Sequence, residues 1–437
     1  MSFGTGITDN LEILTNSQSL NFLLFFIFIT TAKANELERI LDQANKYTVK
    51  IYNSTDTPFI EDSYSPSAGS GFLIDKTNGL IVTNAHVASY SPSLNRVNFK
   101  YSDPIKSKQV YIDPEIDLAF LQIDPKDIPK TAIEAKLQCK NDYKPGSGVV
   151  AFGHPAGKDF TITRGIISAI RYETDFFESI QTDAAINGGN SGGALIDISS
   201  GLVVGINSFG ATDAEGLNFA LPSYTACKVL ELYKNKKDPS PLDFQVLFSN
   251  NKEQGKFLKV SEVLNKQSLL KVGDEVLEVD NKKVENPTQL SNESRGKSNI
   301  TVKILRDNKQ QELKLQLKSR GSVTERSGLI FSNIVIGDKS SSTSGVINQK
   351  MNNPDSNLVV QNLRSGPGSG KLRKFDVINY VDGKEFKTVQ SLHDYLKNKK
   401  VIEIVFRRPG LNEERKIIFT DFHDKIEVED VRLLKFN

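Results

Sequence analysis

Residues 181–195 read QTDAAINGGNSGGAL, and they form the most informative segment of the chain. Ser191 lies there in a glycine-rich turn, Gly188–Gly193, directly before an apolar run that we expect to form a strand at 194–198. Glycines allow the backbone to turn sharply and to direct N–H groups toward a developing negative charge. A serine hydroxyl is a weak nucleophile and needs a base within hydrogen-bond reach. If Ser191 is a nucleophile, the chain must therefore also supply that base.

Two further residues can complete such a site. His86 follows a strand expected at 80–83, in the segment Thr83-Asn84-Ala85-His86-Val87. Asp117 leads the apolar run 118–121, where a buried carboxylate would need a partner. Each residue alone has an ordinary explanation, as part of a flexible turn, as a structural hydrogen bonder or as a turn residue. Together, in the order His, Asp, Ser, they match one of three known triad orders, and the combination favours catalysis.

The region around these residues is typical of an antiparallel β domain. The runs 71–74 and 80–83 flank Asn78-Gly79, which is a strong hairpin signal, and 195–198 and 202–206 flank a second turn. A helical pattern first appears at 224–233. The segment from about 45 to 225 therefore predicts an antiparallel β-barrel or sandwich closed by a helix.

An internal repeat follows a polar, proline-containing linker at 234–243. Residues 272–284 parallel residues 374–386: in each copy an Asp opens a strand, and the strand ends in Asp-Asn or Asp-Gly, which favours a tight turn. Each copy continues into a short helix and a further strand. Two copies about 100 residues apart predict duplicated small domains.

Composition excludes several classes of protein. The 437 residues are 38% apolar and 25% charged, which predicts folded domains, and the net charge of +2 argues against a protein that binds nucleic acid by neutralising phosphates. Two cysteines exclude a disulfide scaffold and a thiolate zinc cluster, and four histidines leave little for a metal site.

The N-terminal segment is typical of export. Residues 22–29 read FLLFFIFI, which is too short to cross a bilayer, and Ala32-Lys33-Ala34 has the form of a signal-peptidase site. Residues 1–21 contain no Lys or Arg, so a buried strand or helix is the alternative. In an exported chain Cys139 and Cys227 could pair, although the sequence does not place them near each other.

Five motifs resemble the HtrA/Deg family of trypsin-like serine proteases. They are TNAHV at 83–87, DLAFL at 117–121, the whole segment 181–195, GSGF at 69–72 and LNFALP at 217–222. The two repeats resemble the C-terminal PDZ domains of that family. The resemblance covers nearly all of residues 45–420.

This resemblance implies a mainly β fold, with a chymotrypsin-like double β-barrel protease domain followed by two α+β PDZ domains. The expected boundaries are a signal peptide at 1–34, the protease domain at 35–234, PDZ domain 1 (PDZ1) at 243–320, PDZ domain 2 (PDZ2) at 325–420 and a C-terminal tail at 421–437.

The resemblance also implies roles for individual residues. Asp117 orients His86, His86 takes the hydroxyl proton of Ser191, and the N–H groups of Gly189 and Ser191 form the oxyanion hole. That hole can be unformed at rest, with the Gly188–Gly189 peptide flipping on activation. The expected substrate-binding residues, of which the first three pair with the substrate backbone and the others line an aliphatic P1 pocket, are Ile206, Asn207, Ser208, Leu217, Asn218, Phe219 and Ala220.

In PDZ2, Gly328, Leu329, Ile330 and Phe331 have the form of a peptide-binding loop and strand. The corresponding segment of PDZ1, 244–248, lacks the glycine, so peptide binding and simple packing stay equal alternatives there. Phe375 replaces the glycine found at Gly273, which can reshape its loop.

His154 stands where the family commonly has Asn and is expected to be structural. Residues 52–68 are shorter than the regulatory loop of some members, which disfavours a loop-blocked hexamer.

The expected function is that of an exported, periplasmic, ATP-independent endopeptidase without a cofactor. Its expected partners are unfolded polypeptides and protein C-termini, within a homotrimer or larger oligomer, with no nucleic acid and with membrane association only if the N-terminal segment is retained. The alternative is a holdase chaperone or PDZ scaffold that binds misfolded chains without cleaving them.

Overall fold

The computed structural model describes residues 37–154, 160–172, 178–210, 216–251, 256–338, 358–364, 370–411 and 417–436. The chain has two units, Met1–Ala44 and Asn45–Asn437. In the first unit the described residues, 37–44, are helical, and the expected signal peptide lies outside the described residues. None of the described helices combines the length and the apolar character that crossing a bilayer requires.

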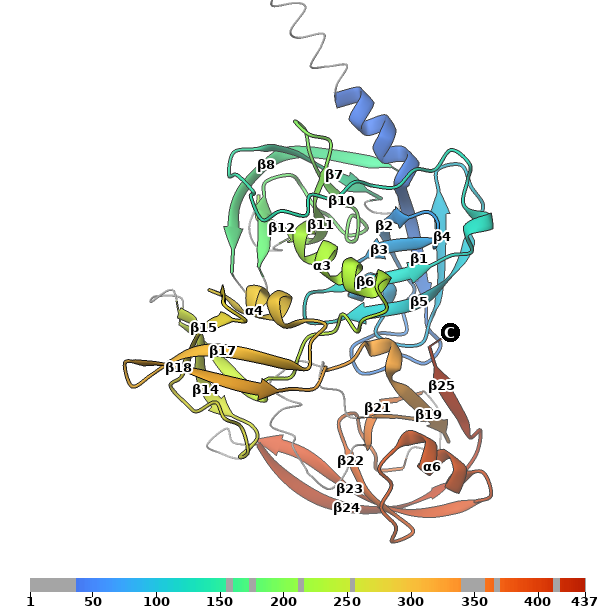
Figure 1. Cartoon of the computed structure of the whole chain (residues 1–437). Helices are drawn as coiled ribbons and strands as arrows, with labels where there is room; N and C mark the ends of the chain where they lie inside the picture. The colour runs from blue at the N-terminus through green and yellow to red at the C-terminus, as the bar shows by residue number, and fades with distance from the viewer. Residues whose placement is uncertain are drawn as a thin grey trace, which may run out of the picture. The chain divides into compact units, whose positions relative to one another are not determined.

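Two closed, six-stranded β-barrels form the first part of the second unit, which confirms the predicted fold class (Figure 1). The strand order of the first barrel is β1-β2-β3-β6-β5-β4. Its strands are β1 (Thr48–Ser54), β2 (Ser67–Asp75), β3 (Leu80–Thr83), β4 (Leu94–Phe99), β5 (Ile105–Asp113) and β6 (Leu118–Gln122), with helix α2 (Ala85–Ala88) after β3 and the 3-10 helix η1 (Pro125–Asp127) after β6.

The predicted hairpin between β2 and β3 turns at Asn78-Gly79. Gly79 has a φ of 66°, and a Cβ atom there would lie 2.1 Å from the carbonyl oxygen of Ile123. Only glycine fits this turn, because any side chain would collide with the backbone.

The second barrel has the strand order β10-β11-β12-β9-β8-β7. Its strands are β7 (Gly148–Gly153), β8 (Thr161–Arg171), β9 (Ser179–Thr182), β10 (Ala194–Asp197), β11 (Val203–Gly210) and β12 (Asn218–Pro222). The helix predicted at 224–233 is α3 (Ser223–Lys234), which follows β12 directly. Strand β10 pairs with β11 in the second predicted hairpin, so the glycine-rich turn of Ser191 enters the barrel through β10.

Each repeat copy forms its own antiparallel sheet with one helix. We keep the names PDZ1 and PDZ2 for the first and second copies, and their assignment as PDZ domains stays a prediction. In PDZ1 the elements are β13 (Val246–Asn251), β14 (Lys256–Val263), β15 (Glu275–Val279), β16 (Lys282–Lys283), α4 (Pro287–Ser294), β17 (Asn299–Arg306) and β18 (Lys309–Gln316). After the 3-10 helix η4 (Val323–Glu325), PDZ2 contains β19 (Ser327–Phe331), β20 (Ile334–Asp338), β21 (Leu358–Leu363), β22 (Val377–Val381), α6 (Val389–Leu396), β23 (Val401–Leu411), β24 (Ile417–Glu427) and β25 (Arg432–Lys435).

The PDZ2 sheet has the order β24-β23-β22-β21-β20-β19-β25. Strands β24 and β25 therefore carry the sheet beyond residue 420, where the sequence predicts a separate tail. Much of the segment expected to be a tail is thus part of the domain.

The duplication extends to ion pairs that the sequence does not reveal. Arg306 binds Asp274 at 2.6 Å and Arg408 binds Asp376 at 2.8 Å, and the two aspartates are the residues that open the equivalent strands. Phe375 has a φ of 74° and donates its N–H to Val360, so it adopts the left-handed conformation that Gly273 adopts in the first copy. The expected change in loop conformation is therefore not observed at this residue, although a left-handed phenylalanine is strained.

A buried ion pair joins PDZ1 to the first barrel. Arg295 at the end of α4 donates to Asp113 of β5 at 2.6 Å and to the carbonyl oxygen of Pro239 at 2.6 Å, and neither charged side chain is exposed. Because an isolated charge is costly to bury, each of these groups requires the other.

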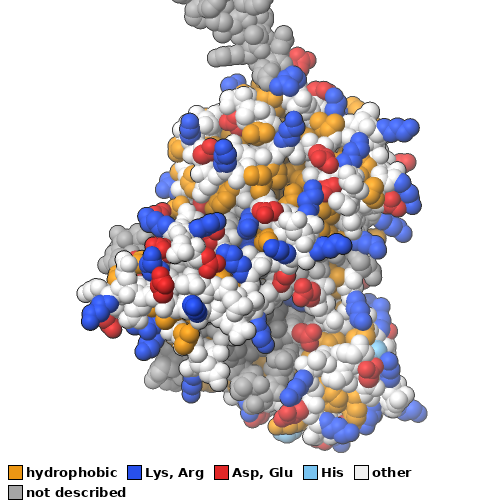
Figure 2. Space-filling view, viewed as in Figure 1, with side chains coloured by type: hydrophobic (Ala, Val, Ile, Leu, Met, Phe, Trp, Pro, Cys, Tyr) orange, Lys and Arg blue, Asp and Glu red, His pale blue; other side chains and the backbone are white. Residues whose placement is uncertain are grey.

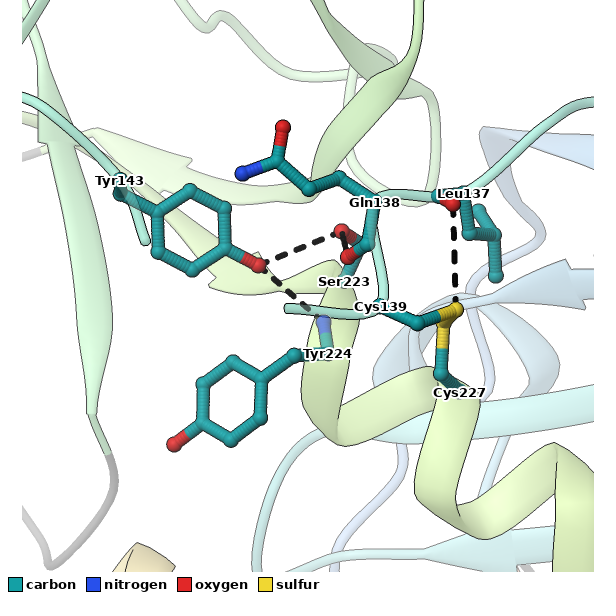
Figure 3. Close-up of a disulfide and its surroundings, with 7 residues drawn as sticks. All are labelled: Leu137, Gln138, Cys139, Tyr143, Ser223, Tyr224 and Cys227. Carbon is teal, nitrogen blue, oxygen red and sulfur yellow. Dashed lines mark hydrogen bonds between the residues drawn. A yellow bond between two sulfur atoms is a disulfide. The ribbon is translucent and has the colours of Figure 1, made fainter. Parts of the chain in front are cut away.

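Cys139 and Cys227 form a disulfide, with Cα atoms 5.6 Å apart (Figure 3). The bond fastens the segment between the two barrels to helix α3. Close to it, Ser223 donates its hydroxyl to the carbonyl oxygen of Gln138 at 2.7 Å, and Tyr143 accepts from the N–H of Tyr224 at 3.1 Å. The pairing that the sequence left open is therefore present.

Charged side chains of both signs are interspersed over the face shown in Figure 2, in keeping with the net charge of +2. This distribution offers no argument for a phosphate-binding surface on that face. That the chain does not bind nucleic acid stays a prediction.

Candidate active site

The structure brings His86 and Asp117 together. His86 lies on the short helix α2, directly after β3, and Asp117 directly precedes β6, which pairs with β3. The His86 Nδ1 atom is 2.9 Å from Oδ2 and 3.0 Å from Oδ1 of Asp117. Asn84 donates its side-chain amide to the carbonyl oxygen of Asp117 at 2.9 Å, which ties the two segments together.

Asp117 accepts hydrogen bonds from three directions. Besides the His86 ring, the backbone N–H of His86 donates to Oδ1 at 3.1 Å and the hydroxyl of Ser208 donates to Oδ2 at 2.7 Å. Asp117 has a φ of 53°, a left-handed conformation that aspartate tolerates better than most residues. These contacts fix the position of the carboxylate. Because Nδ1 of His86 faces Asp117, the second ring nitrogen, Nε2, lies on the opposite edge of the imidazole.

The surroundings of His86 act on its pKa in opposite directions. Desolvation lowers the pKa, whereas the charge of Asp117 and its hydrogen bond raise it, and the net pKa lies above the ordinary value of 6.5. The histidine is therefore a stronger base than a free imidazole. The ring is 44% exposed, so its outer edge is accessible from solvent.

Ser191 lies on the other side of Ser208. Its hydroxyl donates to the carbonyl oxygen of Ser208 at 2.7 Å, and among the described residues no hydrogen bond joins it to the His86 ring. Catalytic hydrogen bonds are often misaligned in the absence of substrate, and a serine changes rotamer by rotation about one bond. Ser208 thus bonds to two residues of the predicted triad, Asp117 and Ser191, a role beyond the one predicted for it.

The turn before Ser191 has a defined conformation. The N–H of Asn190 donates to the carbonyl oxygen of Asn187 at 2.9 Å, and Gly189 has a φ of 102°. Since Gly188 does not have a positive φ, the four residues form a type II turn. A type I turn differs mainly by a flip of the central peptide, Gly188–Gly189, which is the peptide whose N–H is predicted to form half of the oxyanion hole.

Ser70 of β2 holds this turn from the first barrel. Its fully buried hydroxyl donates to the carbonyl oxygen of Gly189 at 2.7 Å, and its N–H donates to the carbonyl oxygen of Ser191 at 2.8 Å. Sequence reasoning assigned Ser70 no role. The only available signal was its place in the motif GSGF.

His154 supports the same serine. Its backbone N–H donates to the Ser70 hydroxyl at 3.0 Å, its Nδ1 lies 3.2 Å from that oxygen, and its ring contacts Phe160 edge-on. The ring is buried, whereas that of His86 is half exposed. This position is consistent with the structural role expected for His154.

The residues expected to pair with a substrate differ in whether their backbone is available to it. Ile206 and Asn207 are fully buried, and the backbone of Asn207 already pairs with that of the nucleophile turn, through Gly192 and Gly193. Their backbone is therefore not available to a substrate, and the expectation is corrected for these two residues. Farther along β11, Phe209 is 40% exposed.

The residues expected to line the P1 pocket lie on or beside β12, next to β11. Leu217 is half-buried, while Asn218, Phe219 and Ala220 are buried. The rings of Phe209 and Phe219 lie 5.0 Å apart, and Asn218 accepts from the N–H of Ile186 at 3.1 Å.

The predicted PDZ2 peptide site is not an open edge. Gly328, Leu329, Ile330 and Phe331 form strand β19, where they are buried, and the strand pairs with β20 on one side and with β25 on the other. The sequence predicted a loop and a free strand edge, because it gave no sign that residues 432–435 would pair there.

Within the described ranges, no group of three or more His, Cys, Asp or Glu side chains is arranged to hold a metal ion. The site consists of a serine, a histidine, a carboxylate and backbone amides. These groups can perform nucleophilic acyl transfer.

Comparison with known proteins agrees with this geometry. A family model described as a trypsin-like peptidase domain matches residues 69–206. The "Probable periplasmic serine endoprotease DegP-like" of Marinomonas sp. (strain MWYL1) is 30% identical over 351 residues, which cover 74% of this chain and 72% of that protein. The "Periplasmic serine endoprotease DegP" of Escherichia coli (strain K12) is 30% identical over 359 residues, which cover 76% and 72%. Among solved structures, "HtrA-type protease AlgW with tripeptide" is 25% identical with a TM-score of 0.51, and the match covers 65% of this chain and 97% of that one. The chain therefore belongs to the HtrA/DegP family of serine endoproteases.

Proposed function

We propose that the protein is an exported endopeptidase that cleaves unfolded polypeptides with Ser191, His86 and Asp117. The observation that carries this proposal is the position of Ser208. Its hydroxyl donates to Asp117, which is bonded to His86, and its carbonyl oxygen accepts from Ser191. The three residues, far apart in the sequence, thus meet around one strand end.

The chemistry follows from these positions. When Ser191 turns to His86, the imidazole takes the hydroxyl proton as the oxygen attacks the peptide carbonyl, and Asp117 stabilises the imidazolium that forms. His86 then protonates the leaving amine. A water molecule repeats the attack on the acyl-enzyme, again with His86 as the base, and frees Ser191.

The negative charge on the tetrahedral intermediate is stabilised by the N–H groups of Gly189 and Ser191. The type II turn at 187–190 and its type I alternative differ in the direction of the Gly189 N–H, so the two turn conformations would differ in their ability to stabilise this charge. Removing one such donor typically costs about 3 kcal/mol in the transition state, so the turn conformation acts as an activity switch.

An extended substrate pairs with the end of β11, from Ser208 to Gly210, where Phe209 is exposed. Its P1 side chain then lies near Leu217 and Phe219, whose apolar character favours small or medium aliphatic residues. The partly exposed ring of Phe209 supports this placement.

Two observations support export. The chain contains a disulfide, which persists in oxidising compartments, and two relatives are named as periplasmic endoproteases. We infer the periplasm as its location. The expected capture of protein C-termini by the PDZ domains, and a homotrimer or larger assembly, belong to the same proposal.

Degradation of reduced casein tests the activity. We expect the purified protein to degrade it without ATP and in the presence of EDTA, and Ser191→Ala to be inactive. Ser199→Ala is a matched control, because Ser199 lies in a hairpin turn away from the triad, where its hydroxyl donates to Asp197 at 2.6 Å. If the wild-type protein were as inert as Ser191→Ala, a binding protein without proteolysis would be the better description.

A further inference from the structure

Strand β25 (Arg432–Lys435) occupies the outer edge of the PDZ2 sheet. It pairs antiparallel with β19, so that Gly328 faces Leu434 and Ile330 faces Arg432. Figure 1 shows β25 beside β19, with α6 nearby. Addition of an extended strand to a sheet edge is a common mode of peptide recognition. Residues of the chain itself therefore hold the position that an incoming peptide would take.

Apolar side chains anchor this strand. Leu433 packs against the main core of PDZ2, while Leu434 and Phe436 pack against Phe59, Ile330 and Val335. Arg432 and Lys435 are exposed. Because adjacent residues of a strand point to opposite faces, Leu433 and Leu434 place an apolar side chain on each face of β25, and this sets the pattern of ligand that the edge accepts.

The edge is shaped for close approach. A Cβ atom on Gly328 would lie 3.2 Å from the Cβ of Leu434 and 2.8 Å from the ring of Phe59. A larger residue at this position would push the strand away. The fit thus depends on the glycine that the sequence marks as part of a peptide site.

Among the described strands β25 pairs with β19 alone, so its release would leave the other strand pairings of the sheet in place. It is preceded by a turn in which Ser332 bonds to Glu429 through both backbone and hydroxyl, and Asp430 has a φ of 48°. This turn anchors the end of β24, so release of β25 needs only a change beyond residue 430. The side chains of β25 are half-buried or exposed, whereas Leu329, Ile330 and Phe331 of β19 are fully buried.

We propose that residues 432–436 are an intramolecular ligand that closes the β19 edge of PDZ2. Their displacement opens the edge to extended segments of unfolded chains with a similar Leu-Leu-x-Phe pattern. This inference rests on the proposed role of PDZ2 in peptide capture. It makes peptide capture depend on the displacement of residues 432–436.

Displacement of residues 432–436 would also affect a loop of the protease domain. Phe59, whose ring packs against Phe436, donates its N–H to the hydroxyl of Ser91 at 2.7 Å. In the same loop Asp62 accepts from Ser89 at 2.8 Å, and Ser89 directly follows the helix that bears His86. Opening the edge therefore uncovers the Phe59 side chain. The loop of Phe59 is hydrogen-bonded to Ser89, which directly follows the helix that bears His86.

A binding assay separates this inference from proteolysis. In a Ser191→Ala background, a fluorescent peptide of residues 431–437, VRLLKFN, is titrated with the full chain and with a chain that ends at Asp430, and anisotropy is measured. We expect at least tenfold tighter binding to the shortened chain, because a closed site lowers apparent affinity by the fraction that is open. A peptide with both leucines replaced by aspartate should bind neither.

Two full-length variants complete the test. Leu434→Glu should bind the peptide like the shortened chain, because it places a charge against Phe59 and Ile330, and it serves if the shortened chain does not fold. Lys435→Ala, which changes an exposed side chain, should remain closed. Equal binding by the full and shortened chains, or no binding by folded Leu434→Glu, would overturn the inference. A failure of the casein assay would leave these binding results unaffected.

Discussion

Replacing Ser70 with alanine is expected to reduce catalysis without touching the triad. The Ser70 hydroxyl is fully buried and donates to the carbonyl oxygen of Gly189 at 2.7 Å. In Ser70→Ala that carbonyl loses its donor inside the protein. A buried polar group left without its partner costs about 1–3 kcal/mol.

The loss of this hydrogen bond destabilises the type II conformation of the turn at 187–190, in which the bond is made. Gly189 lies between the peptide that is predicted to bind the oxyanion and the carbonyl that Ser70 holds. If the whole cost destabilises the type II turn, kcat falls by about 5- to 150-fold, since about 1.4 kcal/mol corresponds to a factor of ten. KM should change little, because Ser70 is fully buried and its side chain is not accessible to a substrate.

Ser223→Ala is the matched control. Ser223 is also fully buried, and its hydroxyl also donates to a backbone carbonyl, that of Gln138, at 2.7 Å. We expect the two variants to lose similar stability in thermal melts, whereas only Ser70→Ala loses kcat on a peptide substrate. If kcat of Ser70→Ala stays within twofold of that of Ser223→Ala, the proposed support of the turn is refuted.

Three further predictions concern stability and pH. The disulfide of Cys139 joins residues 88 apart in sequence, so Cys139→Ser should lower stability by about 4–5 kcal/mol in the chain-entropy model, and an unchanged Tm would contradict this. Because the pKa of His86 is raised and the base must be neutral, kcat/KM should rise with pH through a midpoint above 6.5. Asp117→Asn should lower both the rate and this midpoint, because the carboxylate raises the pKa of His86. An unchanged midpoint would argue against the pairing of His86 with Asp117. Arg295→Ala should destabilise the protein by about 3–5 kcal/mol in urea titrations, because Asp113 would stay buried without its cation, and a loss below about 1 kcal/mol would show that the pair is not needed.

Local patterns were sufficient to predict much of this fold. The Asn78-Gly79 turn and the strands around it, the helix after β12 and the duplicated C-terminal domains all carry their signal within a few neighbouring residues. The Asp280-Asn281 turn illustrates this, since both residues have positive φ as the dipeptide predicts. The motifs around His86 and Ser191 identified the candidate site in the same way.

The remaining features depend on contacts between distant segments. Nothing near Ser70 in sequence indicates that its hydroxyl reaches Gly189, and nothing near Arg295 indicates a buried partner in β5. The position of β25 is set by pairing with a strand about 100 residues earlier. The sequence also included Asn207 among the residues expected to pair with a substrate, because the hydrogen bonds of its backbone to the nucleophile turn are visible only in three dimensions.

The central claim, that Ser191 is made nucleophilic by His86, is tested most directly by covalent labelling. The protein is incubated with a fluorophosphonate, and the modified peptide is identified by mass spectrometry. We predict a single label on Ser191, formed at a rate that drops at least a hundredfold in His86→Ala while the variant keeps its fold. Labelling elsewhere in the chain, or equal labelling of Ser191 with and without the imidazole, would contradict the account.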